Sequence, residues 1–329
     1  MKKGFAALIA VFVIYCLYWA TGRSVMIGRI TTSFDNLETE GYVIDHAGLS
    51  AGGFPFLFRS SLTDPQIISP SSQAKPWSIK ADYLTLQSRT ITPLHWHAMH
   101  HGEARIDMRG PNRKRWLFDV QPFAVDIDTR AKLSGELKSI TASITRPKLK
   151  AVIGTHPPIV GMESSEIKFK SKGQNSVFSI SMTNIILDPD TWPKWQRAFT
   201  SNIDNLDLNF TAEGLTSLSQ TKRINWAKSG RLKGQSWTLN WSDNIFTGDF
   251  DISLSPSGAN GTLRAEIEDF SSVIRQAEQA GLISKEQASV LNTAGKILPQ
   301  SKNGTHEINL NIRDGNILLF GQKVFSFKP

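Results

Sequence analysis

The chain has 329 residues and a net charge of +8, and apolar residues (40 %) outnumber charged residues (20 %). This balance excludes global disorder and leaves enough apolar area for one large domain or two ordinary ones. A basic chain attracts polyanions, either nucleic acid or anionic lipid headgroups, and the charge alone does not choose between them.

The first predicted element is an apolar segment at the N-terminus. Lys2 and Lys3 precede an uninterrupted apolar run over residues 4–20, and the next charge is Arg23. The run exceeds the ~7–15 residues of a signal-peptide core and reaches the ~17–25 residues that cross a bilayer. No small-residue cleavage site follows it cleanly. We therefore predict a transmembrane signal anchor over residues 1–22, with a cleaved signal peptide and a buried helix as the alternatives.

The charges around this segment predict how the chain is oriented. By the positive-inside rule the two N-terminal lysines stay in the cytoplasm, so the body beyond the anchor lies in the periplasm. Tyr15, Tyr18 and Trp19 fall where an aromatic belt would meet the far interface. The only cysteine, Cys16, lies in the anchor, so the body can form no intramolecular disulfide. We expect a single-pass protein of a bacterial inner membrane, held by residues 4–20, and export excludes nucleic acid as its partner.

Residues 23–41 predict a helical stalk. Apolar side chains recur there at helical spacing, namely Met26, Ile30, Phe34 and Leu37. Gly41 would end the helix. We interpret the stripe as a surface that packs on the body of the protein, in preference to a surface for a partner helix.

From residue 42 to about residue 270 the apolar period changes to two, which is typical of half-buried strands. The alternation is clear at Leu84 and Leu86, and again at Val125 and Ile127. No helical segments of adequate length separate the strands, which favours antiparallel connections. The predicted fold class is mainly β, with a long curved antiparallel sheet that forms a sandwich or an open groove. Residues 42–329 show no break in composition, so we predict one periplasmic domain.

Helical spacing returns near the C-terminus. A helical hairpin is predicted at about residues 270–298, and Ser284 with Gln287 forms a capping box at the start of its second helix. Asp314 and Gly315 then provide a tight turn between two final strands.

One short motif matches a catalytic pattern. Gly48-Leu49-Ser50-Ala51-Gly52 has the G-x-S-x-G form of a nucleophile elbow, which needs a helix directly behind the serine. Gly53-Phe54-Pro55-Phe56 follows instead and argues against that helix. We interpret the motif as a glycine-rich bend between strands. Because no P-loop, dinucleotide fingerprint or H-E-x-x-H motif occurs either, we expect no enzyme, no catalytic residues and no cofactor.

A run of histidines is the only candidate metal site. On a strand His95, His97 and His101 share one face, and H-x-H is a spacing that metal ligands use. No cysteine assists them, and solvated histidines at a sheet edge explain the run without an ion. We therefore predict no metal site.

Several segments together resemble one family. They are the anchor with its helical extension, Gly53-Phe54-Pro55-Phe56-Leu57-Phe58-Arg59 followed by Leu62-Thr63-Asp64-Pro65, and the closing run from Arg313 through Asp314 and Gly315 to Gly321. The chain resembles, over nearly its whole length, the bacterial envelope family catalogued as domain of unknown function 2125. It is similar, more distantly, to AsmA-like and TamB-like envelope proteins, whose long β-sheets form a groove with an apolar interior. The family implies no catalytic residues.

The motif Gly53-Phe54-Pro55-Phe56 also carries a structural prediction. Phe54, Phe56 and Phe58 alternate, so on a strand they would share one face, and we expect that face to be buried in the core. Asp314 and Gly315 are the other residues to which we assign a structural role.

The expected function follows from the apolar face of the sheet. We expect it to bind or conduct a hydrophobic ligand, with phospholipid as the leading example. The alternative is a non-catalytic structural or scaffolding protein of the cell envelope, with another envelope protein as its partner. An alternating strand has the same pattern whether its apolar face meets protein, lipid or ligand, so the sequence does not identify the ligand-binding residues.

Overall fold

The computed structural model describes residues 2–73, 76–109, 115–132, 136–153, 159–188, 199–216, 226–281, 283–295, 305–319 and 322–326. The chain divides into two compact units, Met1–Gly135 with Ile144–Thr155, and Glu136–Ser143 with His156–Pro329. Both units consist mainly of antiparallel strands, with a long apolar helix at the N-terminus and helices near the C-terminus, which confirms the predicted fold class. Whether residues 42–329 fold as one domain stays a prediction.

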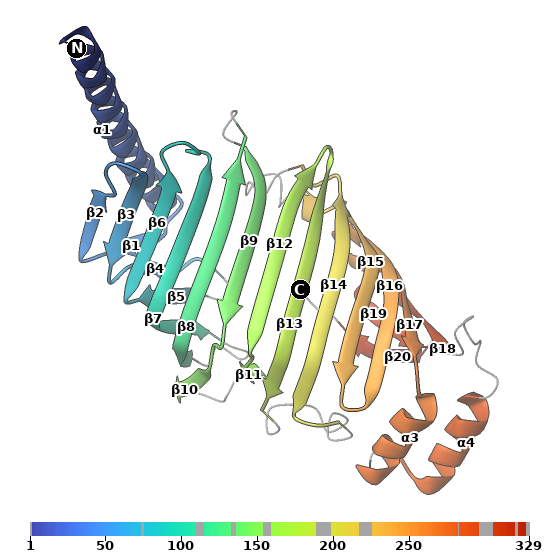
Figure 1. The fold of residues 1–329 in the computed structure, drawn as a ribbon. Helices are drawn as coiled ribbons and strands as arrows, with labels where there is room; N and C mark the ends of the chain where they lie inside the picture. The colour runs from blue at the N-terminus through green and yellow to red at the C-terminus, as the bar shows by residue number, and fades with distance from the viewer. Residues whose placement is uncertain are drawn as a thin grey trace. The chain divides into compact units, whose positions relative to one another are not determined.

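The first unit combines one long helix with a sheet (Figure 1). Its elements are α1 (Lys2–Thr39), β1 (Val43–Asp45), β2 (Gly48–Gly52), β3 (Leu57–Thr63), β4 (Gln66–Ile68), β5 (Trp77–Ala81), β6 (Tyr83–Arg89), β7 (His95–Arg109), β8 (Arg115–Ala131) and β10 (Leu149–Ile153). The predicted anchor and stalk are thus one continuous helix. It is long and apolar enough to cross a membrane.

The long strand β7 organises the sheet of the first unit. One of its edges pairs with β6 near its start and with β5 near its end. β6 continues through β3 to β2, and β5 continues through β4 to β1. The other edge of β7 pairs with β8, which in turn pairs with β10. The β5 and β6 branches separate at Gly102, where the register of β7 against β8 shifts.

The period-two pattern fixes which side chains of this sheet face α1. Leu62 lies opposite Leu84, and Leu86 lies opposite Ala98. The polar residues between them on each strand point to the other face, because successive side chains of a strand alternate. The alternation predicted at Leu84 and Leu86 is therefore confirmed. α1 contacts β1, β2 and β3 of this sheet.

The second unit is a meander of antiparallel strands, and a helical hairpin precedes its last three strands. Its elements are β9 (Leu137–Thr145, of which residues 137–143 belong here), β11 (Ile159–Gly161), β12 (Ser164–Lys172), β13 (Asn175–Leu187), β14 (Asn202–Glu213), β15 (Arg231–Trp241), β16 (Asn244–Ser255), β17 (Gly258–Ile267), α3 (Phe270–Gln279), α4 (Lys285–Gly295), β18 (His306–Arg313), β19 (Asn316–Leu319) and β20 (Gln322–Ser326). From β12 to β20 each strand pairs with the next one along the chain.

A row of aromatic rings crosses the apolar face of the second unit. Phe178 stacks on Phe210 with ring centroids 4.9 Å apart, and the row continues to Phe250. Between Phe210 and Phe250 lies strand β15, which contributes Gly234 to the row. A Cβ at Gly234 would lie 2.4 Å from the Phe250 ring. A glycine is needed there because the ring occupies that space. One cluster of buried residues in this unit consists of Ile185 with its neighbours Leu187, Ile203 and Trp241.

Polar pairs occupy the opposite face of the second unit. Arg231 donates two hydrogen bonds to Asp251, at 2.6 and 2.5 Å, and this pairing lowers the pKa of the Asp251 carboxyl. Arg264 donates to Asp249 at 2.9 Å. One face of the sheet is thus apolar and the other hydrated, as alternating strands require.

The C-terminal turns and caps agree with the sequence. Ser284 N–H donates to Gln287 Oε1 at 2.8 Å, and Gln287 N–H donates to Ser284 Oγ at 3.2 Å, which confirms the capping box. α3 and α4 confirm the predicted hairpin. Asp314 and Gly315 have φ values of 47° and 73°, both in the left-handed region that a two-residue hairpin turn requires.

The prediction that Phe54, Phe56 and Phe58 share one buried face is wrong for two of the three. Phe58 is 3 % exposed, whereas Phe54 is 47 % and Phe56 is 74 % exposed. The reason is that the chain turns from Gly53, which has a φ of 100°, and β3 begins only at Leu57. Strand alternation therefore does not apply to the first two rings.

This difference gives a stability test. Phe58→Ala should lower the free energy of unfolding by about 3–5 kcal/mol, because it truncates a buried ring that packs against α1. Phe56→Ala should change it by less than about 0.5 kcal/mol, because its ring is exposed. Thermal unfolding of both variants in detergent, followed by circular dichroism, measures the two effects. Equal losses of stability would contradict this assignment of buried and exposed rings.

Candidate functional site

Three aromatic side chains of α1 fasten the helix to the sheet of the first unit. Tyr18 Oη donates to the Thr90 carbonyl at 2.7 Å, and Trp19 Nε1 donates to the Leu57 carbonyl at 2.8 Å. Tyr15 Oη donates to the Pro55 carbonyl. These acceptors lie in the β2–β3 and β6–β7 connections and at the start of β3. The helix is thereby held at one end of the strands.

Close packing continues just beyond these hydrogen bonds. The Phe58 ring lies against Gly22, where a Cβ would be 2.5 Å from the ring, and its edge meets Tyr18 at 6.0 Å between centroids. Met26, one turn further along α1, is 5 % exposed. The predicted packing of the stalk stripe on the body is confirmed at this residue.

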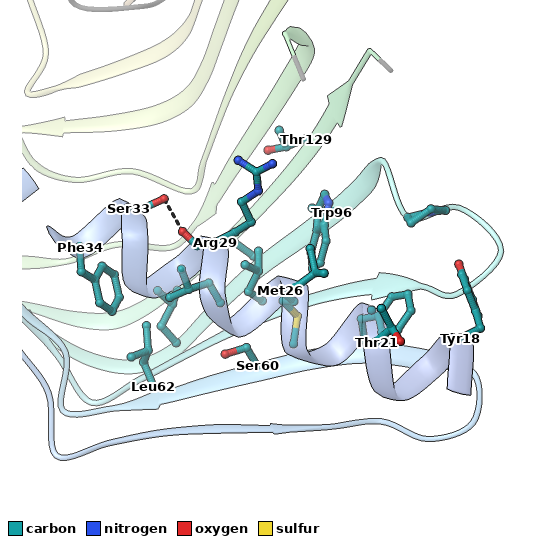
Figure 2. A pocket seen from close by; sticks show the side chains of 18 residues that line it. Tyr18, Thr21, Met26, Arg29, Ser33, Phe34, Ser60, Leu62, Trp96 and Thr129 are labelled. Atoms are coloured by element: carbon teal, nitrogen blue, oxygen red, sulfur yellow. Dashed lines mark hydrogen bonds between the residues drawn. The ribbon is translucent and has the colours of Figure 1, made fainter. Parts of the chain in front are cut away.

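A groove of about 930 Å³ opens between α1 and the sheet. We call it the α1 groove, and Figure 2 shows it from close by. The helix lines one wall and alternate residues of β3, β6 and β7 line the other. Its lining residues are Tyr18, Thr21, Gly22, Val25, Met26, Arg29, Ile30, Ser33, Phe34, Phe58, Ser60, Leu62, Leu84, Leu86, Pro93, Trp96, Ala98 and Thr129. Most are apolar, and the whole groove lies within the first unit.

Few polar groups face the α1 groove. Ser60 is 2 % exposed, and its hydroxyl has no hydrogen-bond partner among the described residues. Arg29 is exposed and forms no ion pair with a carboxylate in the described part of the chain. Figure 2 shows its guanidinium extending across the groove toward Thr129. The site therefore offers one cation and one buried hydroxyl without a partner among the described residues, in a lining that is otherwise mostly apolar.

His95 and His97 lie on the other face of β7, away from the groove, because they alternate with the lining residues Trp96 and Ala98. His95 Nε2 is 2.5 Å and His97 Nε2 is 3.3 Å from the same oxygen of Asp128 on β8. Their ligand atoms are close enough together to hold a metal ion. However, Asp128 already hydrogen-bonds His95 and lies 3.7 Å from Arg130. These two interactions explain why the three side chains lie together without a metal ion. The side chain of His101, the third candidate, lies outside the described residues, and the absence of a metal site stays a prediction.

Ser50 lies in the middle of β2, where its side chain is exposed. β2 pairs with β3 along its length, so the G-x-S-x-G motif sits in a strand–turn–strand unit. The strand–turn–helix of a nucleophile elbow is not formed at this motif. That the protein has no enzymatic activity stays a prediction.

The architecture thus defines a β-rich protein with one long apolar helix and a groove beneath it. A family model described as an uncharacterized protein conserved in bacteria (DUF2125) matches residues 19–324, and the chain belongs to this family. No curated protein and no solved structure matches the chain. The more distant similarity to AsmA-like and TamB-like proteins stays a prediction.

Sequence reasoning did not find the α1 groove, although it found both of its walls. Helical spacing predicts a packed stripe at Met26, Ile30 and Phe34, and strand alternation predicts an apolar face at Leu84 and Leu86. The sequence feature that indicates a groove is a pair of small residues opposite the helix, Ser60 and Ala98, which leave space that larger side chains would fill.

Proposed function

We propose that the protein is anchored in a bacterial inner membrane by α1 and binds a hydrophobic ligand, a phospholipid acyl chain in the first instance, in the α1 groove. The observation that carries the proposal is an apolar groove whose helical wall belongs to the same helix that is long and apolar enough to cross a membrane. A ligand can thus pass between bilayer and groove along one continuous apolar surface. The two N-terminal lysines support a periplasmic location for the protein body, by the positive-inside rule.

The dimensions of the α1 groove fit an acyl chain. Its volume of about 930 Å³ is at the upper end of small-molecule sites, which are typically ~300–1,000 Å³. Its lining on α1 runs from Tyr18 to Phe34, which is about 24 Å at 1.5 Å per residue. One leaflet of a bilayer contributes about 15 Å of hydrocarbon. The groove is therefore longer than an acyl chain as it lies in a leaflet.

The polar groups of the groove support a phospholipid over a plain hydrocarbon. The Arg29 guanidinium has a fork of donors that matches phosphate geometry. It lies about 16 Å along the helix from Tyr18, so a phosphate at Arg29 leaves an acyl chain's length of groove toward the membrane end. The Ser60 hydroxyl is buried in the same lining without a partner among the described residues, and an ester carbonyl that reached it would accept its hydrogen bond.

Topology is the first test of this proposal. A reporter that is active only in the periplasm, fused after Pro329, should be active, and the protein should resist carbonate extraction. These outcomes follow from the lysines before an apolar helix that is long enough to cross the bilayer. Activity of a cytoplasm-only reporter at the same position would contradict the proposed orientation.

Ligand binding is tested by placing a charge in the groove. Leu86→Arg puts a guanidinium among apolar lining residues, where an acyl chain cannot compensate it. We expect this variant to lose most of the phospholipid that remains bound to the full chain in native mass spectrometry from detergent. Gln87→Arg is the matched control, since it adds the same charge to the next residue of β6 on the opposite face, and it should retain the lipid.

The result also separates the proposal from the scaffolding alternative. Retention of lipid by Leu86→Arg at the level of Gln87→Arg would show that the lipid binds elsewhere, on the surface of the helix. Absence of lipid from the unsubstituted chain, together with co-purification of an envelope protein, would favour the scaffolding function instead.

A further inference from the structure

Two connections at one end of the first unit expose large apolar side chains. In the β2–β3 connection Phe56 is 74 % exposed and Phe54 is 47 % exposed. In the β6–β7 connection Ile91 is 82 % exposed and Leu94 is 36 % exposed. We call these four residues the apolar tips. Apolar side chains grouped in this way on adjacent turns mark a surface that meets another apolar phase.

The contacts with α1 place the apolar tips at membrane depth. The two connections receive the hydrogen bonds of Tyr15 and Tyr18, and Phe54 packs edge-on against Trp19 at 5.3 Å between centroids. Tyr15 lies five residues before the end of the apolar run at Ala20, which is about 8 Å along the helix. Apolar groups of interfacial segments enter a bilayer by about 5–10 Å. The contacts of Tyr15 therefore put the tips about as far below the outer end of the apolar run as interfacial segments insert.

In these connections, four backbone carbonyls have hydrogen-bond donors within the protein, as a backbone surrounded by lipid requires. A carbonyl that leaves water without a hydrogen bond costs several kcal/mol in hydrocarbon. Here the Pro55 and Thr90 carbonyls accept from the tyrosines of α1. The Phe56 carbonyl accepts from Thr90 N–H at 3.0 Å, and the Gly53 carbonyl accepts from Leu57 N–H at 2.8 Å. The aromatic side chains thus supply donors that water supplies to an ordinary exposed turn.

Two arginines lie in β3 and β6, next to the connections that carry the apolar tips. Arg89 precedes Thr90 and lies opposite Leu57 in the register of β3 and β6, and Arg59 lies two residues further along β3. Both are exposed. Apolar tips with arginines set back toward the body match the order of acyl chains and anionic headgroups across a leaflet surface.

We propose that the apolar tips insert into the outer leaflet of the membrane that α1 spans, so that the sheet end and the mouth of the α1 groove are seated in the lipid. The inference rests on the proposed membrane anchoring by α1, and it does not require that the groove holds a ligand. The partner is the bilayer itself. Seating of the sheet end would let an acyl chain enter the groove without crossing water.

Spin labels on the full chain test this insertion. In a Cys16→Ala background, which removes the only cysteine, Phe56→Cys and Ile91→Cys each carry a nitroxide in nanodiscs of phosphatidylethanolamine and phosphatidylglycerol. Both sites are exposed and should tolerate the label. We expect each label to be accessible to dissolved oxygen and shielded from a water-soluble nickel complex, as a label in lipid is.

Two further labels serve as references. Val43→Cys, at 55 % exposure, reports a site in water, because α1 ends about 36 Å beyond Tyr15. Val11→Cys, at 67 % exposure, reports whether α1 itself lies in the bilayer.

Each outcome is decisive. Labels at residues 56 and 91 that behave like the label at Val11 support the insertion, even if no lipid is found in the groove. Labels that behave like the one at Val43 overturn it, even if Leu86→Arg shows that the groove binds lipid. A water-exposed label at Val11 would overturn both the anchoring and the insertion.

Discussion

The hydrogen bonds from Tyr15, Tyr18 and Trp19 to the strand-end carbonyls are the interaction on which the rest of the first unit depends. They fix α1 at one end of the sheet with polar contacts that are directional, in contrast to the apolar packing around them. They also satisfy backbone groups at a depth where the proposed bilayer leaves little water. A helix held only by hydrophobic contact could slide along the sheet, and neither the groove nor the depth of the loops would then be defined.

The α1 groove follows from how the packing changes along the helix. At Gly22 the helix and the Phe58 ring are in close contact because the helix has no side chain there. Further along, the sheet contributes small side chains, Ser60 and Ala98, to the lining of the groove. Space that side chains do not fill then remains between the two walls. Apolar area of this kind stabilises a bound acyl chain at roughly 25 cal/mol for each Å² removed from water.

Much of the fold could be predicted from the sequence, because the patterns involved are local. The apolar helix, the alternation at Leu84 and Leu86 and the capping box at Ser284 depend on neighbours within a few residues. The exposure of Phe56 could not be predicted by counting residues, because the turn that starts at Gly53 interrupts the period. Likewise, the pairing of His95 with Asp128 depends on the register of two strands distant in sequence. The groove could not be predicted either, because it depends on the distance between α1 and the sheet, and no local sequence pattern encodes that distance.

In the proposed function, the space between α1 and the sheet holds an acyl chain in the living membrane. A photoreactive benzophenone side chain at Leu62, which lines the groove (Figure 2), tests it by covalent capture in intact cells. We expect irradiation to add the mass of a phospholipid to the full chain. Irradiation that yields no lipid adduct, or that joins the residue to another protein, would contradict it.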